Sequence, residues 1–294
     1  MISIISITYN GLEDTLEMIQ SLKANLRSGS YEIIIIDNGS RINEAEAVSL
    51  KYKDVITVRS EKNLGFAGGN NLGMPIAKGK YILLLNNDTE VKDDSVRFLS
   101  DFLDANPEYG AVSPKILYYS HPDTIQYGGY TSLSEITVRN KTIGMGEKDK
   151  GQCDSTAETA YAHGAAMMVR REIIDKIGMI PEMFFLYYEE YDWCESIKRA
   201  GMKIGYEPKC SVYHKESAAI GIDSPLKSFY MTRNRLLFSW RNRRGIVRLL
   251  SVCYQLMIVV PKEFMLHLAK GQRQQSVSIL KGLFSFFGIN NKMG

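Results

Sequence analysis

The sequence predicts an α/β protein with a mostly parallel sheet flanked by helices, followed by a C-terminal helical extension. Two short runs rich in isoleucine, residues 2–8 and 31–36, are typical of strands that are buried on both faces. Leucine and isoleucine recur at helical spacing between them, and strand and helix patterns keep alternating up to residue 85. Such alternation indicates βαβ units and a parallel sheet.

Each element is expected from its local pattern. Short apolar runs predict strands at 2–8, 31–36, 55–58, 80–85, 164–169, 203–206 and 210–213. Helical periodicity predicts helices at 12–26, 44–53, 66–78, 94–105, 171–177 and 190–200, and from Pro225 to the end. Asn106-Pro107 and Gly201 end two of these helices, because the residue before proline disfavours the helical region and glycine commonly follows a helix. Residues 115–160 show no clean period and are expected to form irregular strands and loops.

Length and composition fit one large domain or one domain with an appendage. The chain has 294 residues, of which 45% are hydrophobic, so a sizeable core is available. Its four cysteines are scattered and form no C-x-x-C pair, which predicts neither a zinc site nor a disulfide framework and favours a reducing, cytoplasmic compartment. Residues 2–8 are too short for a signal peptide and have no basic segment before them.

Charge divides the chain near residue 224. Residues 1–224 hold 24 Lys+Arg against 32 Asp+Glu, a balance of −8, whereas residues 225–294 hold 12 against one, a balance of +11. We therefore expect a catalytic domain at 1–224, with halves at 1–114 and 115–224, and a basic helical region at 225–294. Such a basic region is attracted to an anionic surface.

The apolar run Ile246–Val260 indicates which anionic surface is favoured. It is interrupted by Arg248 and Gln255 and is too short to span a bilayer. Apolar residues interleaved with basic ones suit a helix lying in the membrane interface better than a nucleic-acid groove. We expect peripheral membrane contact and no nucleic-acid partner, with a core or dimer helix as the alternative.

Polar residues follow three of the predicted strands. Thr8, Tyr9 and Asn10 follow the first, Asp37 and Asn38 end the second, and Asn86, Asn87 and Asp88 follow the fourth. Ligands of open α/β sheets bind beyond the carboxyl ends of the strands, so these residues predict a nucleotide site at one sheet edge. Asp37 would accept a hydrogen bond from a base or ribose; its alternative role is a helix N-cap or an Asx-turn.

A glycine-rich segment, residues 63–71, enters a predicted helix. Asn63, Gly68 and Asn70 belong to it, and its glycines allow the backbone to approach a ligand closely. The G-x-x-x-x-G-K-[ST] spacing of a P-loop is missing, and no G-x-G-x-x-G follows the first strand. The second absence argues against a dinucleotide oxidoreductase.

Two groups of residues could carry chemistry. Glu189, Glu190 and Asp192 lie among aromatic residues, where crowded carboxylates raise one another's pKa as a general base requires. The alternative is an acidic helix start, with Asp192 in that role. Asp88 is a hard-metal ligand, and His214 at the end of a short strand could complete the shell of Mn²⁺ or Mg²⁺.

Together these motifs resemble the family 2 glycosyltransferases, which have the GT-A fold, and particularly their bacterial rhamnosyltransferase-like branch. The resemblance covers residues 2–114 and 161–238. It rests on the segments ISITYNG, IIIIDNGS, EKNLGFAGGNNLG, LLLNNDTEV, HGAAMMVRREIIDKIG, MFFLYYEEYDWC and RNRLLF, in this order.

The resemblance implies an inverting transfer of a hexose, such as rhamnose, from a nucleoside-diphosphate sugar to a saccharide or lipid-linked saccharide in cell-surface polysaccharide synthesis. Thr8, Asn10 and Asp37 would contact the nucleotide, Asp88 stands in the metal-binding D-x-D position, and Glu190 holds the base position with Glu189 second. Here the D-x-D is Asn86-Asn87-Asp88, so the first carboxylate is missing, and the base is Glu where Asp is common.

The Q-x-x-R-W signature of processive synthases is missing, which favours one sugar per encounter. The expected location is the cytoplasmic face of the membrane, with a homodimer as a further candidate assembly. Two other functions share the same sequence features: a nucleotidyltransferase, and a non-catalytic protein that binds sugar nucleotides. A nucleotidyltransferase would be expected to have a basic glycine-rich loop after the first strand. A non-catalytic binding protein would not need the two glutamates.

Overall fold

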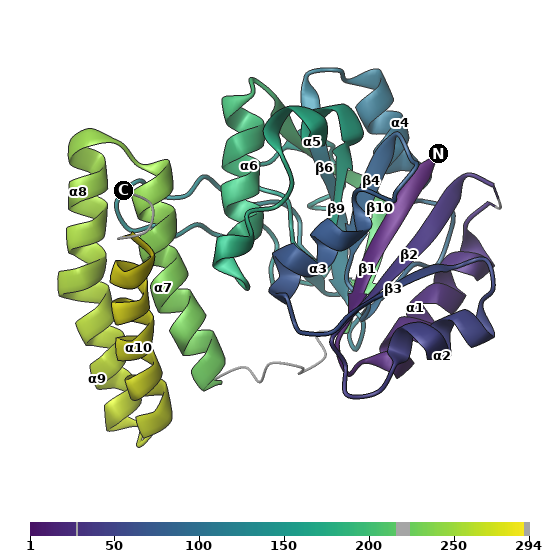
Figure 1. Ribbon diagram of the computed structural model, residues 1–294. Coiled ribbons are helices and arrows are strands. Elements are labelled where there is room, and N and C mark those ends of the chain that lie inside the picture. Colours follow the sequence, from purple (N-terminus) through teal and green to yellow (C-terminus); the bar gives the residue numbers. More distant parts are fainter. Residues whose placement is uncertain (28, 216–223, 291–294) are drawn as a thin grey trace.

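A ten-stranded sheet forms the body of the protein, with helices on both faces and a separate group of C-terminal helices beside it (Figure 1). The computed structural model describes residues 1–27, 29–215 and 224–290. The strands are ordered β3-β2-β1-β4-β9-β6-β10-β5, with β7 paired to β6 and β8 to β10. The expected α/β architecture with C-terminal helices is confirmed.

The N-terminal half of the sheet is parallel. It consists of β1 (Ile2–Thr8), β2 (Tyr31–Asn38), β3 (Ile56–Ser60) and β4 (Tyr81–Leu85). The connecting helices are α1 (Leu12–Asn25), α2 (Glu44–Lys51) and α3 (Gly65–Gly73). Ile4 and Ile35 pack into the core on one face, whereas Ile5 and Ile34 pack into the core on the other. Burial on both faces explains the unbroken isoleucine runs.

The C-terminal half makes the sheet mixed. Strand β9 (Ala166–Arg170) runs antiparallel to both β4 and β6 (Tyr109–Tyr118), and β6 pairs in parallel with β10 (Lys203–His214). Three short strands complete it, β5 (Thr89–Glu90), β7 (Ile125–Tyr127) and β8 (Ala157–Glu158). Two strands expected at 203–206 and 210–213 are one strand, whose register shifts between Glu207 and Ser211.

Strand β6 was not expected as a strand. Pro114 and Lys115 interrupt its apolar pattern, although the strand is almost entirely buried. Buried Lys115 forms ion pairs with Asp149 and Asp154, which hold the pKa of its ammonium group above the usual value despite desolvation. A charge so compensated can occupy a central strand, and periodicity alone cannot identify the compensation.

Four further helical elements lie between the strands of this half. They are α4 (Arg97–Ala105), α5 (Arg171–Ile177), the 3₁₀ turn η1 (Glu182–Phe184) and α6 (Glu189–Arg199). Helix α6 carries the acidic cluster at its N-terminus. Trp193 is almost fully buried, and its Nε1–H donates to the carbonyl of Gly178 over 3.0 Å, which fixes α6 against the end of α5.

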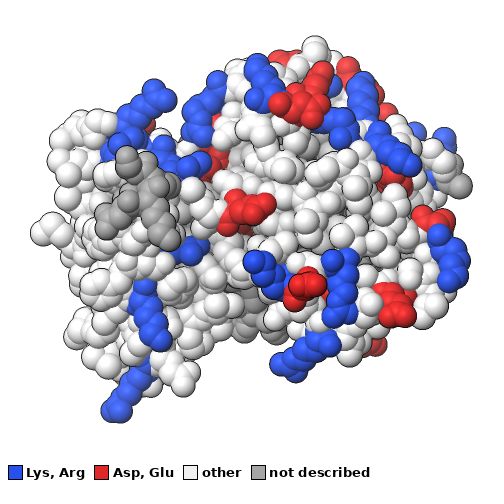
Figure 2. All heavy atoms as spheres, in the orientation of Figure 1, with Lys and Arg blue, Asp and Glu red and all other residues white. Residues whose placement is uncertain are grey.

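The C-terminal region is helical throughout the described residues. It contains α7 (Pro225–Asn242), α8 (Gly245–Tyr254), the π-helical turn η2 (Gln255–Val259), α9 (Val260–Ala269) and α10 (Arg273–Asn290). Helix α10 packs beside α7 (Figure 1). Many large apolar side chains remain exposed here, among them Ile246, Met257 and Phe284. In Figure 2 this part of the surface is largely uncharged, and its charged residues are mainly Lys and Arg.

The apolar run was expected to be too short to span a bilayer, and this expectation about its length is wrong. Residues 245–269 form one continuous helix of 25 residues that is long and apolar enough to cross a membrane by length and composition, and 28% of its apolar window is buried. Gln255 does not interrupt the helix, because its side-chain amide donates to the carbonyls of Ile136 and Thr137. The π-helical turn inserts one extra residue, but the helix continues through it.

An ion pair between a buried carboxylate and a partly exposed arginine joins the catalytic half to the C-terminal region. Asp192 on α6 is almost fully buried, and its two carboxylate oxygens accept hydrogen bonds from Arg241 Nε at 3.0 Å and Nη2 at 3.2 Å. Asn242 Nδ2 adds a third bond at 2.6 Å. The carboxylate of Asp192 is thus fully engaged in holding α7 against α6.

Replacing Arg241 should therefore weaken the whole fold. Arg241→Ala leaves the buried carboxylate of Asp192 with Asn242 alone, and such a loss costs about 1–3 kcal/mol. Arg244→Ala is the matched control, because Arg244 is exposed and forms no ion pair with a described residue. Urea unfolding of the three proteins measures the difference; equal midpoints for both variants would contradict a stabilising role for the pair.

Candidate functional site

The polar ends of β1, β2 and β4 meet at one edge of the sheet, as expected. Asn87 Nδ2 donates to the carbonyl of Gly11 at 3.2 Å and to Thr15 Oγ1 at 3.0 Å, which ties the end of β4 to the start of α1. Asn10 Oδ1 accepts a hydrogen bond from the backbone N–H of Arg41 at 2.9 Å, which ties the end of β1 to the loop after β2.

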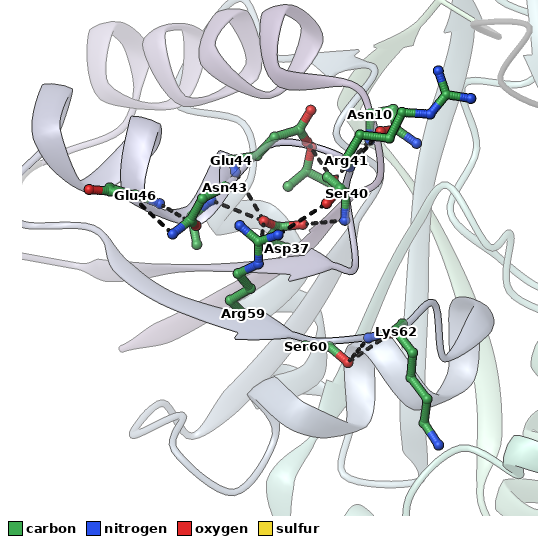
Figure 3. Close-up of polar contacts among 12 residues, drawn as sticks. Asn10, Asp37, Ser40, Arg41, Asn43, Glu44, Glu46, Arg59, Ser60 and Lys62 are labelled. Carbon is green, nitrogen blue, oxygen red and sulfur yellow. Dashed lines mark hydrogen bonds and ion pairs between the residues drawn. The ribbon is translucent and has the colours of Figure 1, made fainter.

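Two buried carboxylates organise this edge (Figure 3). Asp37 accepts from the backbone N–H of Ser40 at 2.9 Å and of Glu44 at 3.0 Å, so it binds the loop and the first turn of α2. Glu44 in turn accepts from the hydroxyls of Thr8 and Ser40 and from the backbone N–H of Gly11. Asp37 is not the N-cap of α2, which is Asn43, but its carboxylate binds the loop that leads into that helix. Its contact with a nucleotide stays a prediction, and Glu44 was not recognised from the sequence.

Burial separates the expected nucleotide contacts into two sets. Five of them are buried: Thr8, Asp37, Asn38, Gly68 and Asn70. Four others are exposed or partly exposed at the edge: Tyr9, Asn10, Asn63 and Asn87. The exposed side chains can contact a ligand, whereas the buried ones shape the loops that carry them. Three basic side chains that the sequence reasoning did not single out surround the same edge, namely Arg41, Arg59 and Lys62 (Figure 3).

The glycine-rich segment is packed against two neighbours. The side chain of Asn38 donates to the carbonyl of Gly65 at 3.0 Å and accepts from Leu64 N–H at 3.0 Å, which fixes the start of α3 to β2. On its other side, Phe66 N–H donates to the carbonyl of Phe185 at 2.8 Å. Gly65 has φ +73°, and a Cβ there would lie 2.1 Å from that carbonyl oxygen, so only glycine fits.

The loop before α6 has an unusual backbone. Phe185, Tyr187 and Tyr188 all have positive φ values, 64°, 68° and 75°. For bulky residues such angles are strained, and strain of this kind clusters at functional sites. Tyr188 is the residue from which helix α6 begins, so the strained loop sets the direction in which Glu189 and Glu190 leave the backbone.

Helix α7 holds the strained loop in place. Nδ2 of the fully buried Asn234 lies within hydrogen-bonding distance of three carbonyl oxygens, those of Phe184, Leu186 and Tyr187, at 2.7–2.8 Å. The neighbouring Arg233 donates to the carbonyls of Met183 and Phe184. These residues belong to the RNRLLF motif. Nothing in the sequence indicates that the motif binds this loop, because its partners are backbone carbonyls.

Arg235 completes this contact. Its Nε donates to the hydroxyl of Tyr188 at 2.9 Å, one residue before the two glutamates. All three residues of the RNR segment therefore bind the loop at 183–188. The loop, and with it the start of α6, depends on α7 for its hydrogen bonds.

The two glutamates have raised pKa values. Burial raises the pKa of Glu190 to about 7, although the side chain remains partly accessible. Burial and the neighbouring Glu190 raise the pKa of Glu189 well above its usual value, and its Oε2 has no hydrogen-bond partner among the described residues. With Asp192 engaged by Arg241, Glu190 is the carboxyl of the cluster that is both reachable and able to take up a proton near neutral pH.

His163 and aromatic rings lie between Glu190 and the end of β4. The backbone of Gly164 approaches the carboxyl carbon of Glu190, and the carbonyl of Ala165 accepts from Asn86 N–H at 2.9 Å. The ring of His163 stacks on Tyr130 and meets His214 edge-on, with centroids 6.4 Å apart. Burial lowers the pKa of His163 to about 3, so its imidazole is neutral.

Asp88 and His214 lie together, as the sequence analysis expected. His214 Nε2 is 3.1 Å from Asp88 Oδ1, and both side chains are mostly buried. His214 Nδ1 lies 2.9 Å from Gln126 Oε1, so the tautomer protonated on Nδ1 would donate to it. In that tautomer Nε2 presents its lone pair towards Asp88, as a metal-binding histidine does.

This donor set fits a divalent metal ion. A carboxylate oxygen and an imidazole nitrogen suit Mn²⁺ or Mg²⁺, and a ligating histidine usually donates its other ring N–H to a fixed acceptor, as this tautomer of His214 does to Gln126. The described residues contain no cluster of three or more His, Cys, Asp or Glu side chains that could hold a metal. A metal bound here would therefore take further oxygen ligands from substrate or water.

Comparison with known proteins shows the family to which the sequence is similar. Residues 3–178 match the family described as "Glycosyl transferase family 2". The chain is 27% identical over 243 residues to the low-salt glycan biosynthesis hexosyltransferase Agl10 of Haloferax volcanii, covering 81% of this chain and 75% of that protein. It is 24% identical over 213 residues to the N-acetylglucosaminyl-diphospho-decaprenol L-rhamnosyltransferase of Mycobacterium tuberculosis, covering 65% and 68%.

A solved structure shows the same fold. The mannosyltransferase PcManGT from Pyrobaculum calidifontis, in complex with GDP-Man and Mn²⁺, superimposes with a TM-score of 0.58 at 12% identity, covering 97% of this chain and 86% of that one. Two further relatives are much longer, and the chain spans only 26% and 18% of their lengths. The similarity to them therefore concerns a part of each.

The contact between Gly65 and the strained loop can be tested against a matched glycine. Gly178 also has a positive φ, 85°, but a Cβ there would meet nothing within 4 Å, so Gly178→Ala should cost only the backbone strain, about 1–3 kcal/mol. Gly65→Ala adds a collision with the backbone of Phe185, and overpacking typically costs about 1–3 kcal/mol more. Urea midpoints measure both, and equal losses would show that the loop yields freely.

Proposed function

The chain belongs to glycosyl transferase family 2, and from this premise we propose that it transfers one sugar at a time, with inversion, from a nucleoside-diphosphate sugar to a saccharide or lipid-linked saccharide acceptor. The observation that carries the proposal is the accessible carboxyl of Glu190, with its pKa of about 7, beside Gly164, whose neighbour His163 contacts the ring of His214 in the Asp88–His214 pair. A hexose such as rhamnose is the favoured donor sugar, since relatives include a hexosyltransferase and a rhamnosyltransferase.

Glu190 acts as the general base. Its carboxylate takes the proton of the acceptor hydroxyl while that oxygen forms a bond to the anomeric carbon. The bond from this carbon to the diphosphate breaks at the same time, and the nucleoside diphosphate leaves with the electron pair. Attack from the face opposite the leaving group inverts the configuration, and no covalent intermediate on the enzyme is needed.

The nucleotide lies at the edge formed by the ends of β1, β2 and β4. Tyr9, Asn10, Asn63 and Asn87 are the expected side chains that can reach it, and Arg41 and Lys62 add positive charge for its phosphates. Asp88 and His214 would hold a divalent metal ion, which when bound neutralises charge on the leaving diphosphate. The relative's structure with GDP-Man and Mn²⁺ supports this assignment.

We further propose that the C-terminal helices rest on the cytoplasmic surface of a membrane. Exposed apolar side chains and a charge of +11 over residues 225–294 support this, because apolar burial and attraction to anionic lipid act together. A membrane location also brings the enzyme to a lipid-linked acceptor. The relative that acts on a diphospho-decaprenol substrate supports such an acceptor.

Glu190→Gln is the test of the base. The change preserves shape and removes basicity, so kcat should fall by roughly 10²–10⁴-fold with donor binding nearly unchanged. In the wild type, kcat should rise with pH and level off above a pH of about 7, because only the ionised carboxylate accepts the proton. Nucleotide release from sugar nucleotides measures both. A larger loss in Glu189→Gln or Asp192→Asn than in Glu190→Gln would move the base elsewhere.

Metal dependence tests the Asp88–His214 pair. Asp88→Asn should reduce turnover by about 10²-fold or more, since it removes the charge that balances the cation. Gln126→Leu removes the acceptor for His214 Nδ1–H and should weaken metal affinity by about 10–100-fold, seen as a higher Mn²⁺ concentration for half-maximal rate. The exposed Asp101 supplies the control variant Asp101→Asn. Full wild-type activity in excess chelator would refute a metal requirement.

Flotation with anionic vesicles tests the membrane contact. The full chain should float at low salt, less so as salt rises, since each basic residue near the surface contributes about 1 kcal/mol. Changing exposed Met257 and Ile258 together to Gln should reduce flotation. Ile42 and Leu50, equally exposed at the other end of the protein, give the control pair. If both double variants float equally well, or if the wild type does not float at all, the membrane contact is refuted and a dimer interface is favoured.

A further inference from the structure

A cavity of about 250 Å³ lies inside the C-terminal helices, away from the sheet edge. It is enclosed by residues of α7, the π-helical turn η2, α9 and α10. Its apolar side is formed by side chains such as Leu236, Val259 and Ile279, and its polar side by charged and hydroxyl groups. A cavity with one apolar and one charged side fits an amphiphilic ligand rather than a sugar or a purely apolar one.

The charged side favours an anion. Lys227, Arg235 and His267 line the cavity, and Glu263 is the one carboxylate among the described residues that line it. Lys227 Nζ has no hydrogen bond or ion pair to a described residue, and Arg235 uses only Nε, so both retain free donors. The first turn of α7, from its N-cap Ser224 onward, also borders the cavity, and a helix N-terminus favours negative charge.

Gln255, which begins the π-helical turn, holds one wall of the cavity in place. It is almost fully buried, and its amide nitrogen donates to the carbonyls of Ile136 and Thr137. Turns of this type occur frequently at functional sites. The wall of the cavity that η2 provides is therefore fixed to the catalytic part of the chain.

Size and surroundings define the apolar part of the ligand. A volume of about 250 Å³ lies below the range of roughly 300–1,000 Å³ usual for whole drug-sized ligands. The cavity therefore holds a head group and the first part of a chain, and a longer chain must continue outside. Exposed Met257 and Ile258 on η2 and Leu226 at the start of α7 provide apolar surface on the same helices.

One residue connects the cavity to the catalytic loop. Arg235 borders the cavity, and its Nε donates to the hydroxyl of Tyr188, which directly precedes Glu189 and Glu190. A head group bound near Arg235 would thus lie next to the loop that carries the proposed base. A sugar attached to that head group would extend towards it.

We propose that this cavity binds the phosphate or diphosphate head and the first chain segment of an isoprenoid-type lipid, the carrier of a lipid-linked acceptor. The proposal rests on the proposed function and adds where the acceptor's lipid is held. Lys227 and Arg235 neutralise the head group, and the apolar wall receives the chain. A membrane phospholipid has the same chemistry of phosphate and chain, and the experiment distinguishes the two.

Equilibrium binding of radiolabelled farnesyl diphosphate to the full-length protein tests this. The wild type should bind it saturably, whereas farnesol and inorganic diphosphate should each bind at least about 10-fold more weakly, because each lacks half of the ligand. Lys227→Gln should weaken binding by about 10-fold or more. Ser228→Phe, which fills the cavity, should abolish it. Lys281→Gln, on α10 but outside the cavity lining, should bind as the wild type does.

Three outcomes would overturn the proposal. They are the absence of saturable binding, unchanged binding in both Lys227→Gln and Ser228→Phe, and equal weakening in Lys281→Gln. Dihexanoyl phosphatidylglycerol that competes as well as farnesyl diphosphate would assign the cavity to bilayer lipid and overturn the acceptor role. Release of nucleoside diphosphate by the wild type, measured on the same preparation with sugar-nucleotide donors and a saccharide acceptor that carries no lipid, reports on the proposed function separately, so failure of either is recognised.

Discussion

The backbone of residues 184–188 can exist in its observed form only because helix α7 supplies its hydrogen bonds. Three non-glycine residues there have positive φ, and each such conformation costs on the order of 1–3 kcal/mol. Arg233 and Asn234 offset this with up to four hydrogen bonds of about 1 kcal/mol each, since the two N–H groups of Asn234 are shared among three carbonyls, and the total is of the same order as the strain. The position of the proposed base, Glu190, is a consequence of this balance.

A second rigid group supports the nucleotide edge. Asp37 and Glu44 are buried and bind backbone N–H groups and hydroxyls from β1, the loop after β2 and α2. Loops held in this way need no rearrangement to present Tyr9 and Asn10 to a ligand. The two groups differ in what they fix: the carboxylates fix the donor edge of the sheet, and the amide of Asn234 fixes the side from which an acceptor approaches.

The sequence was sufficient for the parallel half of the sheet, because strands buried on both faces leave an unbroken apolar run such as residues 31–36. It was insufficient for β6, where Lys115 is compensated by acids more than 30 residues away in the chain. The pairing of Asp88 with His214 was predicted, and its distance agrees. Glu44, Gln126 and Asn234 were missed because their partners are backbone groups or side chains that only the fold brings near.

Burial also corrected the interpretation of the acidic cluster. Three carboxylates in four residues look equivalent in sequence, but a helix turns each in a different direction. Asp192 faces α7 and is paired with Arg241, Glu189 is enclosed, and Glu190 remains accessible. The role that each carboxylate of such a cluster can take depends on which neighbouring helix packs against it.

The pairing across α6 and α7 has a genetic consequence. A chimera joined at residue 224 would take its first C-terminal helix from another chain. The buried carboxylate of Asp192 and the carbonyls of the loop at 183–188 would then lack the donors that α7 supplies. The two sides stay matched only if the crossover falls beyond Asn242, after the last residue that bonds to Asp192. Residues 225–242 are therefore expected to be inherited together with the catalytic region, and Ser251 and Gln255, which both donate to the carbonyl of Ile136, extend this requirement into the next helix.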